Sequence, residues 1–71
     1  MLLSKKLVYI NGEAYKYKAS FTVLSLLTYL SFNTGLIVID YNGTILPTEL
    51  WPKTVLVEND RIEILTVAGG G

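Results

Sequence analysis

The residues of this 71-residue chain best suited to unusual chemistry are the three glycines at its end, Gly69, Gly70 and Gly71. Glycine has no side chain and adopts backbone conformations that other residues avoid. Three in a row can enter a slot that any Cβ atom would block and present the α-carboxylate of Gly71 inside another protein, a known mode of recognition. Glycine runs also occur at frayed termini and as expression scars. The rest of the chain has to decide between these interpretations.

The composition removes most catalytic chemistry. The chain has no cysteine and no histidine, so it lacks a thiol nucleophile, thiolate metal ligands and the commonest general base. Six basic residues balance six acidic ones, for a formal net charge of zero, which argues against a nucleic-acid partner. Glu58, Asp60 and Glu63 lie close together in the sequence, but a solvated acidic turn explains them better than a metal site. We expect this chain to bind no cofactor or metal.

The length and hydrophobicity predict one small domain. Hydrophobic residues make up 51% of the chain, which is enough for a core, and residues 1–71 form one domain with residues 68–71 as a flexible tail. The longest apolar stretch, residues 21–30, is interrupted by polar residues and does not suit a membrane span. The first residues lack the pattern of a signal peptide. We therefore expect a soluble protein of the cytoplasm or of a plastid stroma, with no membrane partner.

The first half of the chain predicts a β-hairpin followed by a helix. Residues 6–10 are rich in β-formers and an Asn-Gly dipeptide follows them, which is the strongest short signal for a hairpin turn. Residues 13–18 then alternate. From Thr22 the period changes to that of a helix, with Thr22 or Ser20 as the N-cap. The stripe that should face the core consists of Val23, Leu26, Leu27 and Leu30.

The second half predicts two strands joined by a short return strand and one helical turn. We expect Asn33 and Gly35 to end the helix. Residues 36–41 form a nearly continuous apolar run, typical of a central strand buried on both faces. A second Asn-Gly turn and a short return strand follow. Thr48 then caps a single helical turn that Pro52 limits, and in it Trp51 covers one end of the core.

The last predicted strand, residues 61–67, leads directly to the glycines. If Ile62 and Ile64 face the core, alternation places Arg61, Glu63, Leu65 and Val67 on the other face. Leu65 and Val67 are then a candidate patch for partner contact beside the tail. The order of elements describes an α+β domain, with one main helix on a mixed sheet of four to five strands. It is the order of the ubiquitin-like β-grasp.

With this order and this ending, the sequence resembles the ThiS family, the small sulfur carriers of thiamine biosynthesis. The likeness covers nearly the whole chain. It departs from the family at Thr48, where Arg is common, at Asn59, where Gly is usual, and at the additional Gly69. The segments that carry the likeness are Ile10-Asn11-Gly12-Glu13, Phe21-Thr22-Val23, Asn42-Gly43 with Pro47 and Trp51, and Asp60-Arg61-Ile62-Glu63-Ile64 running on to the glycines.

The resemblance implies a carrier and not an enzyme. In the family, an activating enzyme of the ThiF type uses ATP and magnesium to adenylate the terminal carboxylate, here that of Gly71. Sulfur from a sulfur-donating enzyme replaces AMP, and a thiazole synthase of the ThiG type uses the resulting thiocarboxylate. Gly70 and Gly69 would provide clearance and reach. Separately, because the alternation of the last strand places apolar residues on its exposed row, we expect Leu65 with Val67 to dock the two partner enzymes in turn.

Two alternatives stay open from the sequence. The small subunit of molybdopterin synthase and the protein-conjugating ubiquitin-like modifiers share this fold and a Gly-Gly end. The middle segment with its Asn-Gly, Pro and Trp, together with the short length, favours the thiamine carrier. The second alternative is a β-grasp interaction module that does not act as a carrier and whose tail is incidental. Loss of function on removing Gly71 would distinguish a carrier from such a module.

Overall fold

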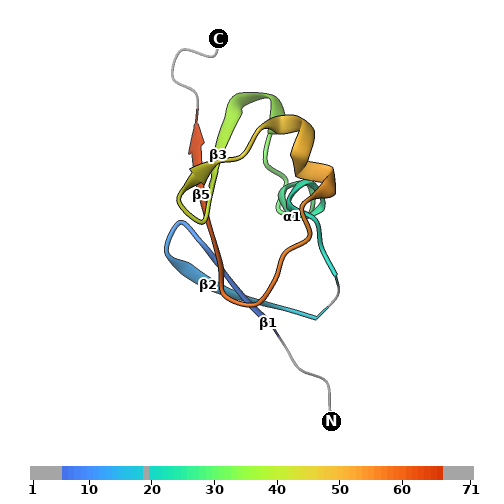
Figure 1. The fold of residues 1–71 in the computed structure, drawn as a ribbon, viewed down its shortest axis with the longest axis vertical. Helices are drawn as coiled ribbons and strands as arrows, with labels where there is room; N and C mark the ends of the chain where they lie inside the picture. The colour runs from blue at the N-terminus through green and yellow to red at the C-terminus, as the bar shows by residue number, and fades with distance from the viewer. Residues whose placement is uncertain (1–5, 19, 67–71) are drawn as a thin grey trace.

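The computed structural model describes residues 6–18 and 20–66 as five strands, one α-helix and two 3₁₀ turns (Figure 1). Among the residues predicted to form the tail and its patch, Val67, Gly69, Gly70 and Gly71 lie outside this described part. The elements in chain order are β1 (Lys6–Ile10), β2 (Glu13–Tyr17), α1 (Val23–Tyr29), η1 (Thr34–Leu36), β3 (Ile37–Tyr41), β4 (Thr44–Ile45), η2 (Thr48–Lys53) and β5 (Asp60–Thr66).

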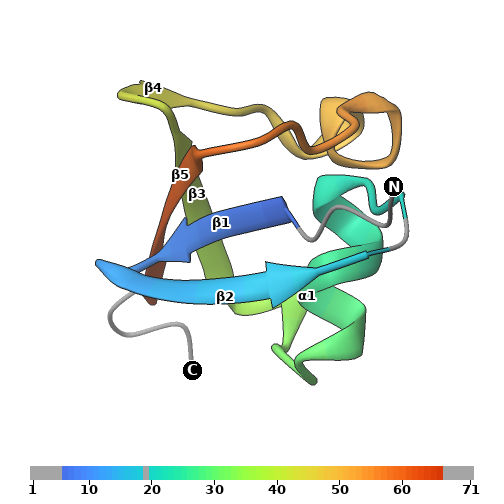
Figure 2. The same cartoon turned by 90° about the horizontal axis from the view of Figure 1, so that it is seen from below.

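The strands form one mixed sheet in the order β2-β1-β5-β3-β4. β1 and β5 run parallel and the other neighbours run antiparallel, so the last strand lies at the centre of the sheet. Figure 2 shows α1 on one side of the sheet, which leaves the opposite face uncovered within the described part of the chain. The predicted α+β architecture is confirmed.

Both Asn-Gly dipeptides form the predicted hairpin turns. Asn11 and Gly12 have φ angles of 51° and 86°, and Asn42 and Gly43 have φ angles of 53° and 94°. Positive φ at both central residues is what a type I′ turn requires, and asparagine and glycine tolerate it best. The first turn joins β1 to β2 and the second joins β3 to β4.

The helix begins where the sequence predicts and ends earlier. Thr22 is the N-cap, since its side chain accepts a hydrogen bond from the N–H of Ser25 and the Ser25 side chain reciprocates. The predicted stop at Asn33 and Gly35 is wrong. Ser31 takes the left-handed conformation, with φ 66°, directly after the C-cap residue Leu30. Asn33 instead caps η1 by accepting from the N–H of Gly35.

The core lies between α1 and the sheet and is closed at one end by η2. Trp51 is only 2% exposed and donates from Nε1 to the carbonyl of Leu46, which confirms its predicted place. The predicted cap Thr48 is wrong, because Pro47 occupies the cap position of η2 without a side-chain bond, and Pro52 lies inside this 3₁₀ turn. Burial of each large apolar side chain contributes about 1.5–3 kcal/mol. The other core residues are Val8, Ile10, Tyr17, Val23, Leu26, Leu27, Ile39, Leu56, Ile62 and Ile64.

The apolar strand β3 is less buried than its sequence suggests. Only Ile39 is fully buried, and its neighbours along the strand are half-buried. β3 lies between the central β5 and the two-residue β4. Its second face therefore belongs to the uncovered side of the sheet. Part of its continuous apolar run packs in the core, and the rest contributes apolar side chains to the uncovered face.

Candidate functional site

The central strand β5 presents different side chains to the two faces of the sheet. Asp60, Ile62 and Ile64 point to the core side and are 4%, 1% and 8% exposed. The alternate residues of the strand are exposed, and Leu65 among them is 50% exposed. The predicted alternation is thus confirmed over the described part of the strand, and Leu65 lies on the open face as expected.

Leu65 belongs to an apolar patch that crosses three strands on the uncovered face. It pairs directly with Val38 of β3. Ile45 of β4 lies opposite Asp40, which is on the same face as Val38 because it is two residues further along β3. Ile45 is 54% exposed. We call Val38, Ile45 and Leu65 the outer-face patch. The sequence predicts Leu65 on this face but not Val38 and Ile45, since strand pairing alone brings the three together.

Charged residues lie beside this patch. Glu63 pairs directly with Asp40 across β5 and β3, and carboxylates in that position destabilise a sheet. Asp40 is held by its role in the second hairpin turn, where its Oδ1 accepts from the N–H of Gly43 at 2.8 Å. Glu63 has no such bond in the part of the chain that the structure describes. On β1, Tyr9 carries the Arg61 guanidinium 5.2 Å above its ring centroid.

The start of β5 is fixed by a buried carboxylate. Asp60 accepts hydrogen bonds from the Tyr41 hydroxyl at 2.6 Å, from Asn42 Nδ2 at 3.0 Å and from the N–H of Val57 at 2.9 Å. Burial, followed by the bond to Asp60 and its negative charge, raises the pKa of Tyr41 to about 12. The prediction that Asp60 lies in a solvated acidic turn is wrong. Its carboxylate can be buried because three hydrogen bonds satisfy its oxygens, and these bonds organise the loop before β5.

Both hairpin turns are also tied to β5 by asparagine side chains. Asn11 Oδ1 accepts from the N–H of Ile64 at 2.7 Å, and Asn42 Oδ1 accepts from the N–H of Arg61 at 2.7 Å. The backbone N–H groups of the same asparagines donate to Ile62 and Arg61. The strand that leads to the glycines is therefore anchored at both hairpins, a role that turn propensity alone does not reveal.

This arrangement suits presentation of a segment to another protein. The described residues contain no cluster of three or more His, Cys, Asp or Glu that could hold a metal ion. Over the same residues, no helix is long and apolar enough to cross a membrane. What the geometry provides is a rigid central strand with an apolar patch on its open face.

The chain is similar to one protein family and to several known proteins. The family model described as the ThiS family matches residues 8–71. The uncharacterized protein ycf40 of Trieres chinensis is 39% identical over 66 residues, covering 93% of this chain and 90% of that protein. The ycf40 protein of Porphyra purpurea is also 39% identical, over 64 residues and 90% of each chain.

Two further relatives have names that concern thiamine chemistry. A thiazole synthase of Paramagnetospirillum magneticum is 35% identical over 62 residues, which cover 87% of this chain but 19% of the synthase. The crystal structure of the thiamine biosynthesis protein ThiS of Geobacter metallireducens superposes with a TM-score of 0.79 at 26% identity, covering 92% of this chain and 99% of that one. The predicted ubiquitin-like β-grasp fold is thereby confirmed.

Proposed function

Because the chain belongs to the ThiS family, we propose that it is a sulfur carrier whose terminal glycine, Gly71, supplies the sulfur of the thiazole in thiamine biosynthesis. The observation that carries the proposal is the family match, which extends through the glycines to residue 71. The structural likeness to a thiamine biosynthesis protein supports it. The chain then serves as a protein substrate and carrier for partner enzymes.

The proposed chemistry begins at a carboxylate, which is a poor electrophile. Attack of the Gly71 carboxylate on ATP forms an acyl-adenylate and releases pyrophosphate. A sulfur nucleophile then attacks the acyl carbon and AMP leaves, so that a thiocarboxylate replaces the carboxylate. The activating enzyme supplies ATP and magnesium for this step. Gly70 and Gly69 provide a backbone narrow enough to reach into its site.

The proposed consumer of the thiocarboxylate is a thiazole synthase. A segment similar to this chain makes up 19% of the thiazole synthase of Paramagnetospirillum magneticum. Fusion of such a segment to a synthase in one polypeptide supports joint action of the two. The activating enzyme and the sulfur-donating enzyme are partners that the proposed chemistry requires. The expected location, the cytoplasm or a plastid stroma, stays a prediction.

We assign partner docking to the outer-face patch, because Leu65 belongs to the strand that precedes the tail in the sequence. Leu65 is half exposed and Val38 and Ile45 extend its apolar surface, and apolar surface of this kind marks protein interfaces. Both enzymes have to approach the same tail, so they should compete for this face. Leu65→Glu should weaken binding of each enzyme while the melting temperature changes little. A large loss of stability would show that Leu65 is needed by the fold and would remove the argument for docking.

The experiment that tests the carrier function is intact-mass measurement after incubation with ATP, a cognate ThiF-type enzyme and sulfide. The expected result is a mass gain that matches replacement of one carboxylate oxygen by sulfur. The gain should be absent in a variant that lacks Gly71 and has the same melting temperature. An unchanged mass for the intact chain with an activating enzyme that charges its own carrier would contradict the proposal and favour an interaction module.

A further inference from the structure

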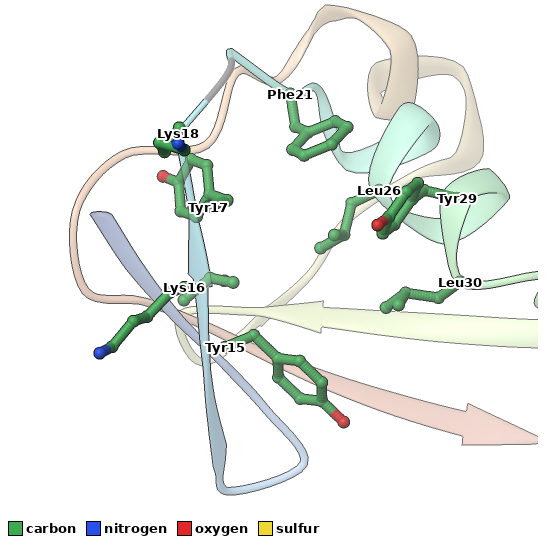
Figure 3. A pocket seen from close by; sticks show the side chains of 9 residues that line it. Tyr15, Lys16, Tyr17, Lys18, Phe21, Leu26, Tyr29 and Leu30 are labelled. Carbon is green, nitrogen blue, oxygen red and sulfur yellow. The ribbon is translucent and has the colours of Figure 1, made fainter. Parts of the chain in front are cut away.

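A second surface lies on the core side of the sheet, between β2 and α1, away from the outer-face patch. It is a groove of about 410 Å³. Figure 3 shows Tyr15 on β2 and Tyr29 and Leu30 at the end of α1 bordering it, with Phe21 near its other end. The buried side chain of Leu26 contributes to its floor. Nothing in the carrier chemistry uses this groove.

The walls of the groove are aromatic and partly open to solvent. The ring centroids of Tyr17 and Phe21 are 6.2 Å apart, and those of Phe21 and Tyr29 are 5.7 Å apart. Tyr29 is 72% exposed and Tyr15 is 41% exposed. Rigid aromatic side chains of this kind are common anchors at protein interfaces because they bury a large area for little lost conformational entropy.

The strand beside the groove is an edge strand. Within the described residues, β2 pairs with β1 and with no other strand. In an antiparallel pair, every second residue directs its N–H and C=O away from the partner strand. β2 therefore offers a row of backbone donors and acceptors that a further strand can pair with. An apolar groove next to such an edge is the arrangement that β-strand addition uses.

β2 begins with Glu13, which accepts a hydrogen bond from the Tyr15 hydroxyl at 3.4 Å, and the lysines further along the chain select the chemistry of the added strand. Lys16 and Lys18 both border the groove, and Lys16 pairs with Leu7, with Figure 3 showing its side chain pointing away from α1. Lys18 follows two residues later. Neither lysine forms an ion pair in the part of the chain that the structure describes. Pairing of β2 with a second copy of itself would gather the lysines of both copies, and edge lysines disfavour such self-association.

We propose that an extended segment of a partner protein, with alternating apolar and acidic residues, adds to β2 as an additional strand. Its apolar side chains fill the groove along Tyr15, Phe21 and Tyr29. Its acidic side chains alternate onto the opposite face, beside Lys16 and Lys18. The groove and the outer-face patch lie on opposite sides of the sheet, so a partner in the groove leaves the outer-face patch open.

The test uses a fluorescein-labelled synthetic peptide of alternating Ile and Glu, with binding to the purified chain followed by fluorescence anisotropy. Saturable binding is expected. A peptide of the same composition with its Ile and Glu in two blocks tests the alternation, and alternating Ile and Lys tests the charge. N-methylation of alternate amides tests backbone pairing. Each change should weaken binding roughly tenfold, because the three changes remove the match of side chains to the two faces, the charge complementarity and the backbone pairing, respectively.

Variants of the chain test where the peptide binds. The double change Lys16→Glu with Lys18→Glu, and separately Tyr29→Ser, should each weaken binding with little change in melting temperature because these side chains are at the surface. Leu65→Glu on the opposite face is the matched control and should leave peptide affinity unchanged. Three results would each overturn the proposal. They are equal affinity for the Ile-Lys peptide, the absence of saturable binding, and sedimentation showing that the chain dimerises through β2. No ATP or enzyme is present, so the outcome is independent of the carrier test.

Discussion

The side-chain oxygen of Asn11 accepts a 2.7 Å hydrogen bond from the N–H of Ile64, which ties the first hairpin turn to the central strand. Asn11 has φ 51°, a conformation that glycine adopts without strain. Asn11→Gly therefore removes the side-chain bond and preserves the turn. We expect a loss of about 1–2 kcal/mol in the free energy of unfolding, since the Ile64 N–H is left without its partner. Urea denaturation measures this loss.

Asn59 provides the matched control for that change. It also has a positive φ, of 70°, but its side chain forms no hydrogen bond in the part of the chain that the structure describes. Asn59→Gly relieves a left-handed conformation that costs a non-glycine residue about 1 kcal/mol, and this gain is offset by a more flexible unfolded chain. The expected change is therefore within about 0.5 kcal/mol of zero. An equal loss in the two variants would show that Asn11 acts through its backbone alone.

Tyr41, which is half-buried, and Tyr17, which is buried, should respond in opposite ways to removal of the hydroxyl group. The Tyr41 hydroxyl donates to the Asp60 carboxylate at 2.6 Å, so Tyr41→Phe should destabilise the fold by about 1.5–3 kcal/mol. The Tyr17 hydroxyl is buried without a hydrogen-bond partner among the described residues. Tyr17→Phe should raise stability by about 1 kcal/mol, since an unsatisfied buried group is removed. Thermal unfolding of both variants checks this contrast, and a loss of stability in Tyr17→Phe would contradict it.

The same tyrosines predict a loss of stability at alkaline pH. Burial, then the hydrogen bond to Asp60, raises the pKa of Tyr41 from 10.0 to about 12, and burial also raises the pKa of Tyr17. The folded state holds these protons more tightly than the unfolded chain. The stabilisation is therefore complete below pH 10 and is lost as the pH rises from 10 towards 12. Denaturation over this window should show a smaller slope for Tyr41→Phe, and an unchanged slope would contradict the assignment.

The elements that sequence reasoning predicted correctly are those set by local chemistry. Positive φ at Asn-Gly explains both turns, and Thr22 and Ser25 form a local capping box. The alternation of β5 followed from placing Ile62 in the core. Thr48 failed as a cap because the chain enters η2 as a 3₁₀ turn through Pro47, a choice that depends on how the segment around Trp51 packs.

The features that sequence reasoning missed depend on contacts between distant segments. Asp60 meets Tyr41 only because β5 inserts beside β3, so nothing local distinguishes a buried Asp60 from an acidic residue in solvent. The outer-face patch likewise needs the register that sets Val38 opposite Leu65. The alternation of residues in the sequence predicts which side chains share a face of one strand. Only the pairing of strands decides which residues of different strands lie next to each other in a site.

The pairing of Glu63 with Asp40 predicts a conflict between stability and docking. The two residues lie directly opposite each other in the strand register beside the outer-face patch, and a pair of like charges in that position destabilises a sheet. Glu63→Lys replaces repulsion with attraction and should stabilise the fold by about 0.2–1 kcal/mol. If the proposed partners place a basic side chain between these carboxylates, the same change should weaken their binding several-fold and raise its rate of dissociation.

Calorimetric unfolding and surface-immobilised binding of the activating enzyme measure the two effects separately. Glu49→Lys is the matched control, because Glu49 lies in η2, outside the strands that form the patch. It makes the same change in net charge and should leave binding by the enzyme unchanged. Higher stability with unchanged affinity in Glu63→Lys would show that the enzyme does not use this acidic pair, and docking would then rest on Leu65 and its apolar neighbours alone.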